Sequence, residues 1–126
     1  MGYSWEVLEG GSILWGAWDA DFDLARDVPL SMRDEIKLLN GSRGPVVVVY
    51  DTRSANTNWD DMMRLSSSGS HEITTHPNLV SRILLTDKEV ERAIAQNLNT
   101  DAFGNLQIHV TTSEDEALSL ARQLLR

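Results

Sequence analysis

The stretch Val46-Val47-Val48-Val49-Tyr50-Asp51 decides the fold class of this 126-residue chain. Its four valines form a continuous apolar run, whereas a strand with one solvated face alternates apolar and polar residues. A continuous β-branched run is typical of a central strand that is covered on both faces. We therefore predict an α/β domain whose sheet is built around this strand.

The N-terminal residues predict a β-hairpin. Tyr3 to Leu8 alternates apolar and polar residues, and Glu9-Gly10-Gly11-Ser12 then supplies turn residues. Ile13 to Trp18 follows as the second strand. The hairpin therefore precedes the central strand in the chain.

A helix is predicted between the hairpin and the central strand. Proline is tolerated in a first helical turn, so Pro29 marks the start of this helix, with Asp27 as its cap. Asn40-Gly41-Ser42 is a stop signal at its other end. The apolar positions with helical spacing are Met32, Ile36 and Leu39.

The C-terminal half repeats a strand followed by a helix. Val80 to Leu85 and Leu106 to Val110 are the predicted strands. Thr86-Asp87-Lys88-Glu89 and Ser113-Glu114-Asp115-Glu116 have the form of capping boxes and open a helix after each strand. With a further helix beginning near Trp59, the element order is β-β-α-β-α-β-α-β-α. Strands joined by helices usually run parallel with right-handed crossovers, so this order predicts a mixed sheet of about five strands with an N-terminal hairpin, in a single domain over residues 1–126.

Composition limits the classes of function. The net charge of −8 repels phosphate backbones, so nucleic acid is not expected as a partner. The absence of cysteine excludes disulfides, thiol nucleophiles and thiolate metal sites. The apolar runs are too short for membrane insertion and no charged-then-apolar leader is present, so we expect a cytoplasmic protein.

Two patterns resemble metal sites without meeting their requirements. Asp19-x-Asp21-x-Asp23 has the carboxylate spacing that opens an EF-hand loop, but Leu24 and Leu30 stand where the turn glycine and the closing glutamate are needed. His71 and His76, five residues apart, match no zinc pattern. We expect no metal, no cofactor and no catalytic residue.

Three local patterns, in this element order, resemble the STAS/SpoIIAA-like domain family. They are the strand that ends in an acidic residue (Val46 to Asp51), the stretch Asn78 to Leu85, and the closing Thr112-Ser113-Glu114-Asp115-Glu116-Ala117-Leu118. The resemblance covers nearly the whole chain. It implies a non-catalytic regulatory or protein-interaction module.

The resemblance also implies a place for a phosphorylation switch. Family members related to anti-sigma-factor antagonists carry a phosphorylatable serine, within an Asp-Ser-Ser-Gly-like sequence, at the start of the helix after the central strand. Here the neighbourhood is Asn56-Thr57-Asn58-Trp59-Asp60-Asp61, which lacks both the serine pair and the glycine. Ser54 and Thr57 are the remaining acceptors, with Arg53 able to offset part of the repulsion from the adjacent aspartates.

Candidate binding residues gather where the parallel strands end, because helix N-termini converge at that edge of such sheets. We expect three segments to meet there: Asp51 to Asn58, Thr86-Asp87 and Thr111 to Ser113. Capping and first-turn roles account for many of these side chains as well as ligand binding does. The candidates in the first segment are Asp51, Arg53, Ser54, Thr57 and Asn58.

Aromatic and methionine side chains supply the other candidates. Trp59, Met62 and Met63 would suit an adaptable apolar pocket. Trp15 and Trp18 lie an odd number of residues apart in one strand, so they face opposite sides of the sheet and one of them is a candidate anchor for a partner.

Three functions remain open on this evidence. The first is an interaction module that binds a protein partner or self-associates through the hairpin. The second is a carrier or sensor of a small apolar or lipid-like ligand held between the sheet and the helices. The third is an enzyme using Asp51, Arg53 or a histidine, for which no complete catalytic constellation is visible.

Overall fold

The computed structural model describes residues 2–55, 77–89, 92–93 and 108–126. Its strands and helices are β1 (Tyr3–Leu8), β2 (Ile13–Trp18), α1 (Leu24–Asn40), β3 (Val46–Asp51), β4 (Leu79–Leu85), β5 (Ile108–Thr111) and α5 (Glu114–Leu124). The helix predicted near Trp59 lies outside the described residues, as does most of the helix predicted after Thr86.

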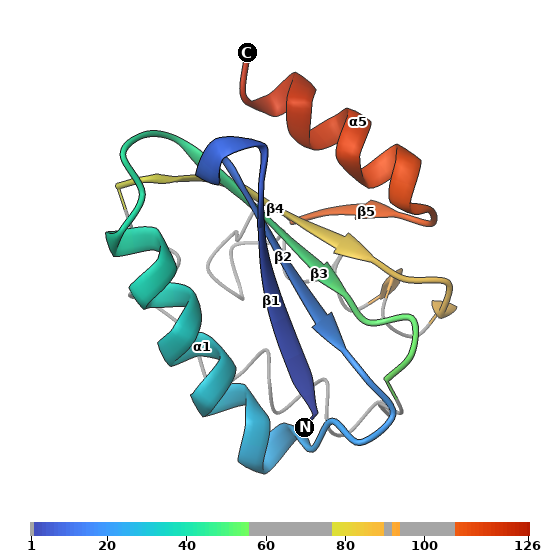
Figure 1. Ribbon diagram of the computed structural model, residues 1–126. Coiled ribbons are helices and arrows are strands. Elements are labelled where there is room, and N and C mark those ends of the chain that lie inside the picture. Colours follow the sequence, from blue (N-terminus) through green and yellow to red (C-terminus); the bar gives the residue numbers. More distant parts are fainter. Residues whose placement is uncertain (1, 56–76, 90–91, 94–107) are drawn as a thin grey trace.

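The strands form one five-stranded sheet in the order β1-β2-β3-β4-β5. β1 pairs with β2 in antiparallel register, Trp5 opposite Gly16, and each later strand is parallel to its neighbour. The predicted mixed sheet with an N-terminal hairpin is therefore confirmed. Figure 1 shows the sheet with α1 and α5 on opposite sides of it.

The central strand β3 separates two apolar clusters. Val46, Val47, Val48 and Val49 are all fully buried, as the continuous apolar run predicts. Because strand side chains alternate, two of these valines face α1 and two face α5. The α5 cluster contains Ile13, Val47, Val49, Ile83, Leu85, Ala117 and Ala121. The α1 cluster contains Leu14, Leu39, Val46 and Val48.

The hairpin is shaped by glycines at two places. Its turn runs through Glu9, Gly10 and Gly11 with φ angles of 52°, 73° and 100°, a left-handed conformation that glycine adopts without steric cost. Within β2, the ring of Trp5 lies over Gly16, where a Cβ atom would come within 2.8 Å of the ring. Glycine at position 16 therefore seats the Trp5 ring against the sheet, in edge-to-face contact with Tyr50.

The start of α1 differs from the prediction. The helix begins at Leu24, and its N-cap is Asp23, whose side chain accepts a hydrogen bond from the Arg26 amide at 3.1 Å. Asp27 lies inside the helix, where its buried carboxylate accepts from the Asp23 amide at 2.9 Å and from the Arg26 guanidinium. The hydrogen bonds from Arg26 hold the pKa of Asp27 below its usual range. These reciprocal bonds extend the helix in front of Pro29, so the predicted cap at Asp27 is wrong.

The last helix starts as predicted. The Ser113 hydroxyl accepts from the Glu116 amide at 3.2 Å, and the acidic residues of the capping box occupy the first turn of α5. Carboxylates at that end are favoured by the helix dipole. Neither α1 nor α5 is long and apolar enough to cross a membrane.

Candidate functional site

The carboxyl ends of β3, β4 and β5 meet at one edge, as predicted. The Thr52 amide donates to the Leu85 carbonyl at 3.1 Å, and the Thr86 amide donates to the Thr111 carbonyl at 3.0 Å. Thr52, Thr86 and Thr111 are all buried there. The described starts of the three predicted segments are thus joined through backbone hydrogen bonds, and residues 56–58 of the first segment lie outside the described residues.

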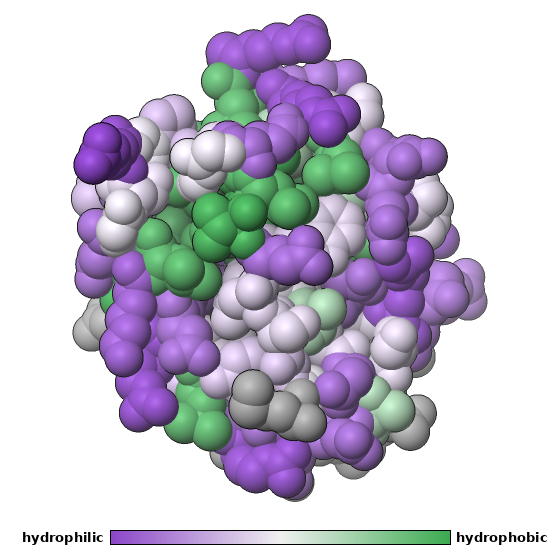
Figure 2. All heavy atoms as spheres, in the orientation of Figure 1, coloured by the Kyte–Doolittle hydropathy of each residue, from purple (hydrophilic) through white to green (hydrophobic). Residues whose placement is uncertain are grey.

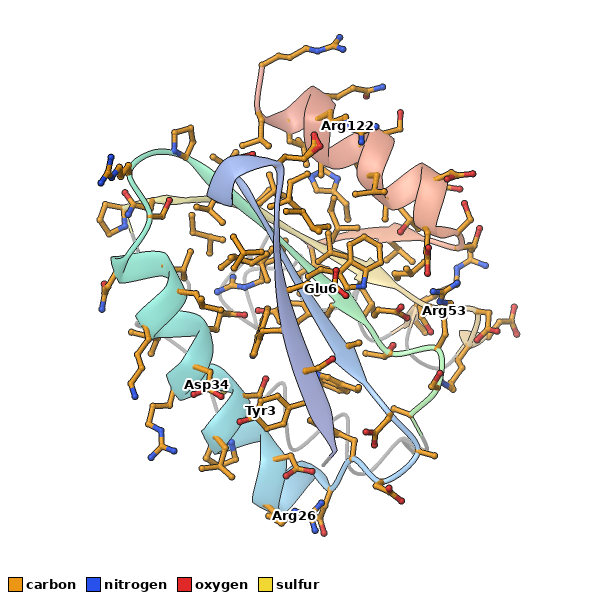
Figure 3. All side chains as sticks on the ribbon, viewed as in Figure 1. Tyr3, Glu6, Arg26, Asp34, Arg53 and Arg122 are labelled. Carbon is orange, nitrogen blue, oxygen red and sulfur yellow. The ribbon has the colours of Figure 1, made fainter. Side chains whose placement is uncertain are left out.

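Arg53 supplies the guanidinium group predicted at this edge, and it forms ion pairs with two carboxylates. Its Nε and Nη2 atoms donate to both oxygens of Asp51 at 3.0 and 2.9 Å, and Nη2 also lies 2.9 Å from Glu114 of α5. The hydrogen bonds that Arg53 donates to Asp51 are the largest cause of the raised pKa of Arg53. Figure 3 shows Arg53 beside the first turn of α5. The pairing ties the loop after β3 to α5 and occupies the cation that an anionic ligand would need.

Lys88 closes the same edge from the other side. Its Nζ atom donates to the carbonyls of Thr52 and Arg53, at 2.7 and 3.2 Å. The carbonyls of Thr52 and Arg53 therefore have a hydrogen-bond donor within the protein. Ser54 lies exposed beside them. Together these contacts join the ends of β3, β4 and β5 to one another and to α5.

A second polar cluster lies inside the protein, between α1 and the sheet. The Tyr50 hydroxyl donates to Oε1 of Glu35 at 2.5 Å and accepts from Nε of Arg82 at 3.2 Å. Glu35 is 1% exposed and Arg82 4% exposed. A carboxyl of α1 and a guanidinium of β4 are thus bridged by one hydroxyl of β3. We call Glu35, Tyr50 and Arg82 the buried triad.

Burial controls the charges of the triad. Removal from water raises the pKa of Glu35 to about 7, although the Tyr50 hydrogen bond and the positive charge of Arg82 each lower it in part. Burial likewise raises the pKa of Tyr50, which keeps its hydroxyl protonated. Glu35 is therefore the member of the triad that exchanges a proton near neutral pH.

Each charged member of the triad has one buried atom without a hydrogen-bond partner. These atoms are Oε2 of Glu35 and Nη2 of Arg82, and the indole nitrogen of the neighbouring Trp5 is in the same state. An unpaired buried polar atom costs roughly 1–3 kcal/mol, more if it is charged. The triad is thus a costly feature of the core.

A second tyrosine also bonds to α1. The Tyr3 hydroxyl of β1 donates to Asp34 at 2.7 Å, at the more solvated side of the helix (Figure 3). Asp34 and Glu35 are consecutive, so two adjacent carboxyls of α1 each accept a hydrogen bond from a tyrosine of the sheet. One of these bonds is buried with Arg82, and the other is half-exposed.

The structure places two of the predicted aromatic candidates. Trp18 is buried and stacks on Phe22 with ring centroids 4.1 Å apart, beside Tyr3 and Met32. Trp15 is half-buried and packs on the opposite face, against the α5 cluster. The predicted opposite facing is therefore confirmed, and both rings pack within the domain. Five further candidates lie outside the described residues: Thr57, Asn58, Trp59, Met62 and Met63.

The buried triad did not emerge from the sequence, although two signals pointed to it. Glu35 stands between Met32 and Leu39, at positions three and four residues away on the apolar stripe of the helix. Arg82 follows Ser81 in the middle of β4, directly before the apolar residues Ile83 to Leu85. Two opposite charges at core positions of neighbouring elements indicate a buried pair.

No family model, curated protein or solved structure matches the chain. The described residues contain no group of three or more histidine, aspartate or glutamate side chains able to hold a metal ion.

Proposed function

We propose that this domain is a non-catalytic regulatory or protein-interaction module of STAS/SpoIIAA-like type, and that it binds a second copy of itself through the edge of β1. The mixed five-stranded sheet with its N-terminal hairpin is compatible with that family. The position of β1 carries the proposal, because β1 is an edge strand of the sheet and, among the described residues, has a strand neighbour on one side alone.

An unprotected edge strand favours pairing with another strand. Natural edge strands are usually blocked by proline, lysine, a bulge or a covering element. β1 contains neither proline nor lysine, and its single charged residue is Glu6. Its residue Val7 is 54% exposed. The backbone groups on the outer side of β1 suit addition of a strand.

The surface around β1 supports the same site. Figure 2 shows hydrophobic side chains gathered in the upper half of the face on which β1 lies, toward the hairpin turn and α5. Val7 and the partly buried Leu8 belong to that end of β1. Exposed apolar side chains rimmed by polar ones are typical of interaction surfaces.

Symmetry restricts how two β1 strands would pair. A two-fold antiparallel pairing that keeps both sheets facing the same way sets a residue opposite its own copy. Pairing centred on Glu6 would oppose two carboxylates, whereas pairing centred on Trp5 sets Glu6 opposite Ser4 of the second copy. We therefore propose the Trp5-centred register.

Charge substitutions at Ser4 test this register. Ser4 is exposed, so Ser4→Glu leaves the fold intact and places a carboxylate opposite Glu6 of the second copy, twice by symmetry. We expect Ser4→Glu to weaken dimerisation roughly fivefold or more, and the matched control Ser4→Lys to strengthen it, in sedimentation equilibrium at low salt. A wild-type protein that stays monomeric at the highest concentrations, or two variants that behave alike, would contradict the proposal.

A second function, a carrier or sensor of a small apolar or lipid-like ligand between the sheet and the helices, is supported by one observation. The buried nitrogens of Trp5 and Trp18 and the free atoms of the buried triad all lie on the α1 side of the sheet, where a ligand's polar groups would find partners. Native mass spectrometry of the purified protein separates the two functions. A retained small molecule supports the carrier, and a bare chain mass opposes it.

A further inference from the structure

The buried triad joins α1 to the central strand β3 and to its neighbour β4. Its two charges are linked through the Tyr50 hydroxyl, which donates to Glu35 and accepts from Arg82. Oε2 of Glu35 and Nη2 of Arg82 are buried and unpaired. The negative charge of an ionised Glu35 would therefore be only partly compensated in the core.

The protonation state of Glu35 sets the cost of keeping α1 in place. A protonated carboxyl is neutral and still accepts the hydrogen bond from Tyr50. An ionised carboxyl adds the cost of a buried charge, which is relieved when the carboxyl reaches water. The pKa of about 7 for Glu35, raised mainly by burial, places this exchange near neutrality.

We propose that Glu35, Tyr50 and Arg82 form a proton-controlled latch, which holds α1 on the sheet while Glu35 is protonated and loosens α1 when the proton is lost.

The neighbours of Glu35 concentrate this effect on α1. Among the described residues, the titratable and charged groups that act on it are Tyr50 of β3 and Arg82 of β4. On α1 itself, the Asp34 carboxylate accepts a hydrogen bond from the Tyr3 hydroxyl of β1. Apolar side chains of α1 also contact the sheet, Leu39 in the α1 cluster and Met32 beside Trp18, and the Leu39 carbonyl accepts a hydrogen bond from Asn78 at 2.9 Å. α5 packs on the opposite face, so it serves as an internal comparator.

Amide hydrogen exchange of the intact protein tests the latch. Protection is measured for α1 and α5 at pH 5.5 and pH 8.0 and corrected for the intrinsic pH dependence of exchange. An opened state in which Glu35 titrates normally predicts a roughly 10- to 30-fold loss of α1 protection between these pH values. The protection of α5 should change much less. Equal changes in both helices, or none in α1, would overturn the latch.

Three variants identify the group responsible. Glu35→Gln is expected to abolish the pH difference in α1. Tyr50→Phe removes a hydrogen bond that stabilises the ionised carboxylate, so the loosening should move to higher pH. Asp34→Asn, a matched change one residue away, should keep the wild-type response. If α1 still lost protection at high pH in Glu35→Gln, or no longer did so in Asp34→Asn, Glu35 would not be the group responsible. Should Glu35→Gln fail to fold, the Tyr50→Phe shift still decides the matter.

Discussion

Replacing Arg82 with methionine is expected to lower the free energy of unfolding by about 2 kcal/mol at pH 8, because one hydrogen bond is lost and Glu35 must take up a proton roughly one pH unit above its pKa. Methionine keeps most of the side-chain volume and removes the charge that compensates Glu35. At pH 5.5 the carboxyl is largely protonated, so the loss should shrink to about 1 kcal/mol, the contribution of one hydrogen bond to Tyr50. Urea unfolding at the two pH values measures both quantities.

Arg122→Met is the matched control for this substitution. Arg122 pairs with Glu9 on the surface, at 2.9 Å, and its side chain is largely exposed. Exposed pairs contribute little, so this variant should unfold almost as the wild type does at both pH values. Equal stability of Arg82→Met and the wild type at pH 8 would show that Arg82 does not compensate Glu35.

The second large effect is the pH dependence that Glu35 gives to the whole domain. Its folded-state pKa of about 7 lies above the ordinary value of 4.5, so folding favours the protonated form. The resulting stability is complete below pH 4.5 and is lost as the pH rises through 7. Glu35→Gln removes this term. The difference in unfolding free energy between the variant and the wild type should therefore rise by roughly 3 kcal/mol from pH 4.5 to pH 8.

The difference in unfolding free energy between the two proteins cancels the contributions of the other carboxyls, provided that the substitution leaves their pKa values unchanged. Glu6→Gln, which removes an exposed carboxylate from β1, provides the control and should give no comparable trend. A flat difference for Glu35→Gln would mean that Glu35 is solvated in the folded protein.

The fold could be predicted because its signals are local. A valine run covered on both faces, a glycine turn and a serine cap each act within a few residues, and β3, the hairpin and α5 follow from them. The start of α1 could not, because two capping patterns compete there. Proline at position 29 favours a late start, and only the bonds among Asp23, Arg26 and Asp27 reveal the earlier one.

Of the polar sites too, one could be predicted from the sequence and the others could not. The edge formed by β3, β4 and β5 was predictable, because parallel strands bring their ends together. Arg53 forms ion pairs with Asp51 and Glu114, and the second pair depends on the packing of α5. The sequence does not specify this packing. The buried triad requires the register of β3 against β4, which sets Val48 beside Arg82, and the rotation of α1 above them.

Tyr50 connects the two proposals in space. Its hydroxyl belongs to the buried triad, and its ring contacts Trp5 of β1 at a centroid distance of 6.3 Å. Trp5 is the residue at the centre of the proposed pairing between two β1 strands. The contact between the rings of Trp5 and Tyr50 therefore links the proposed latch to the proposed dimerisation edge.

The most direct test of the account is the titration of the Glu35 side-chain carboxyl, followed by carbon-13 NMR in the intact wild-type protein. The buried triad predicts a midpoint near pH 7, with α1 amide signals shifting over the same range. A midpoint near the ordinary glutamate pKa of 4.5 would contradict it, because the carboxyl would then be as well solvated as one on the surface.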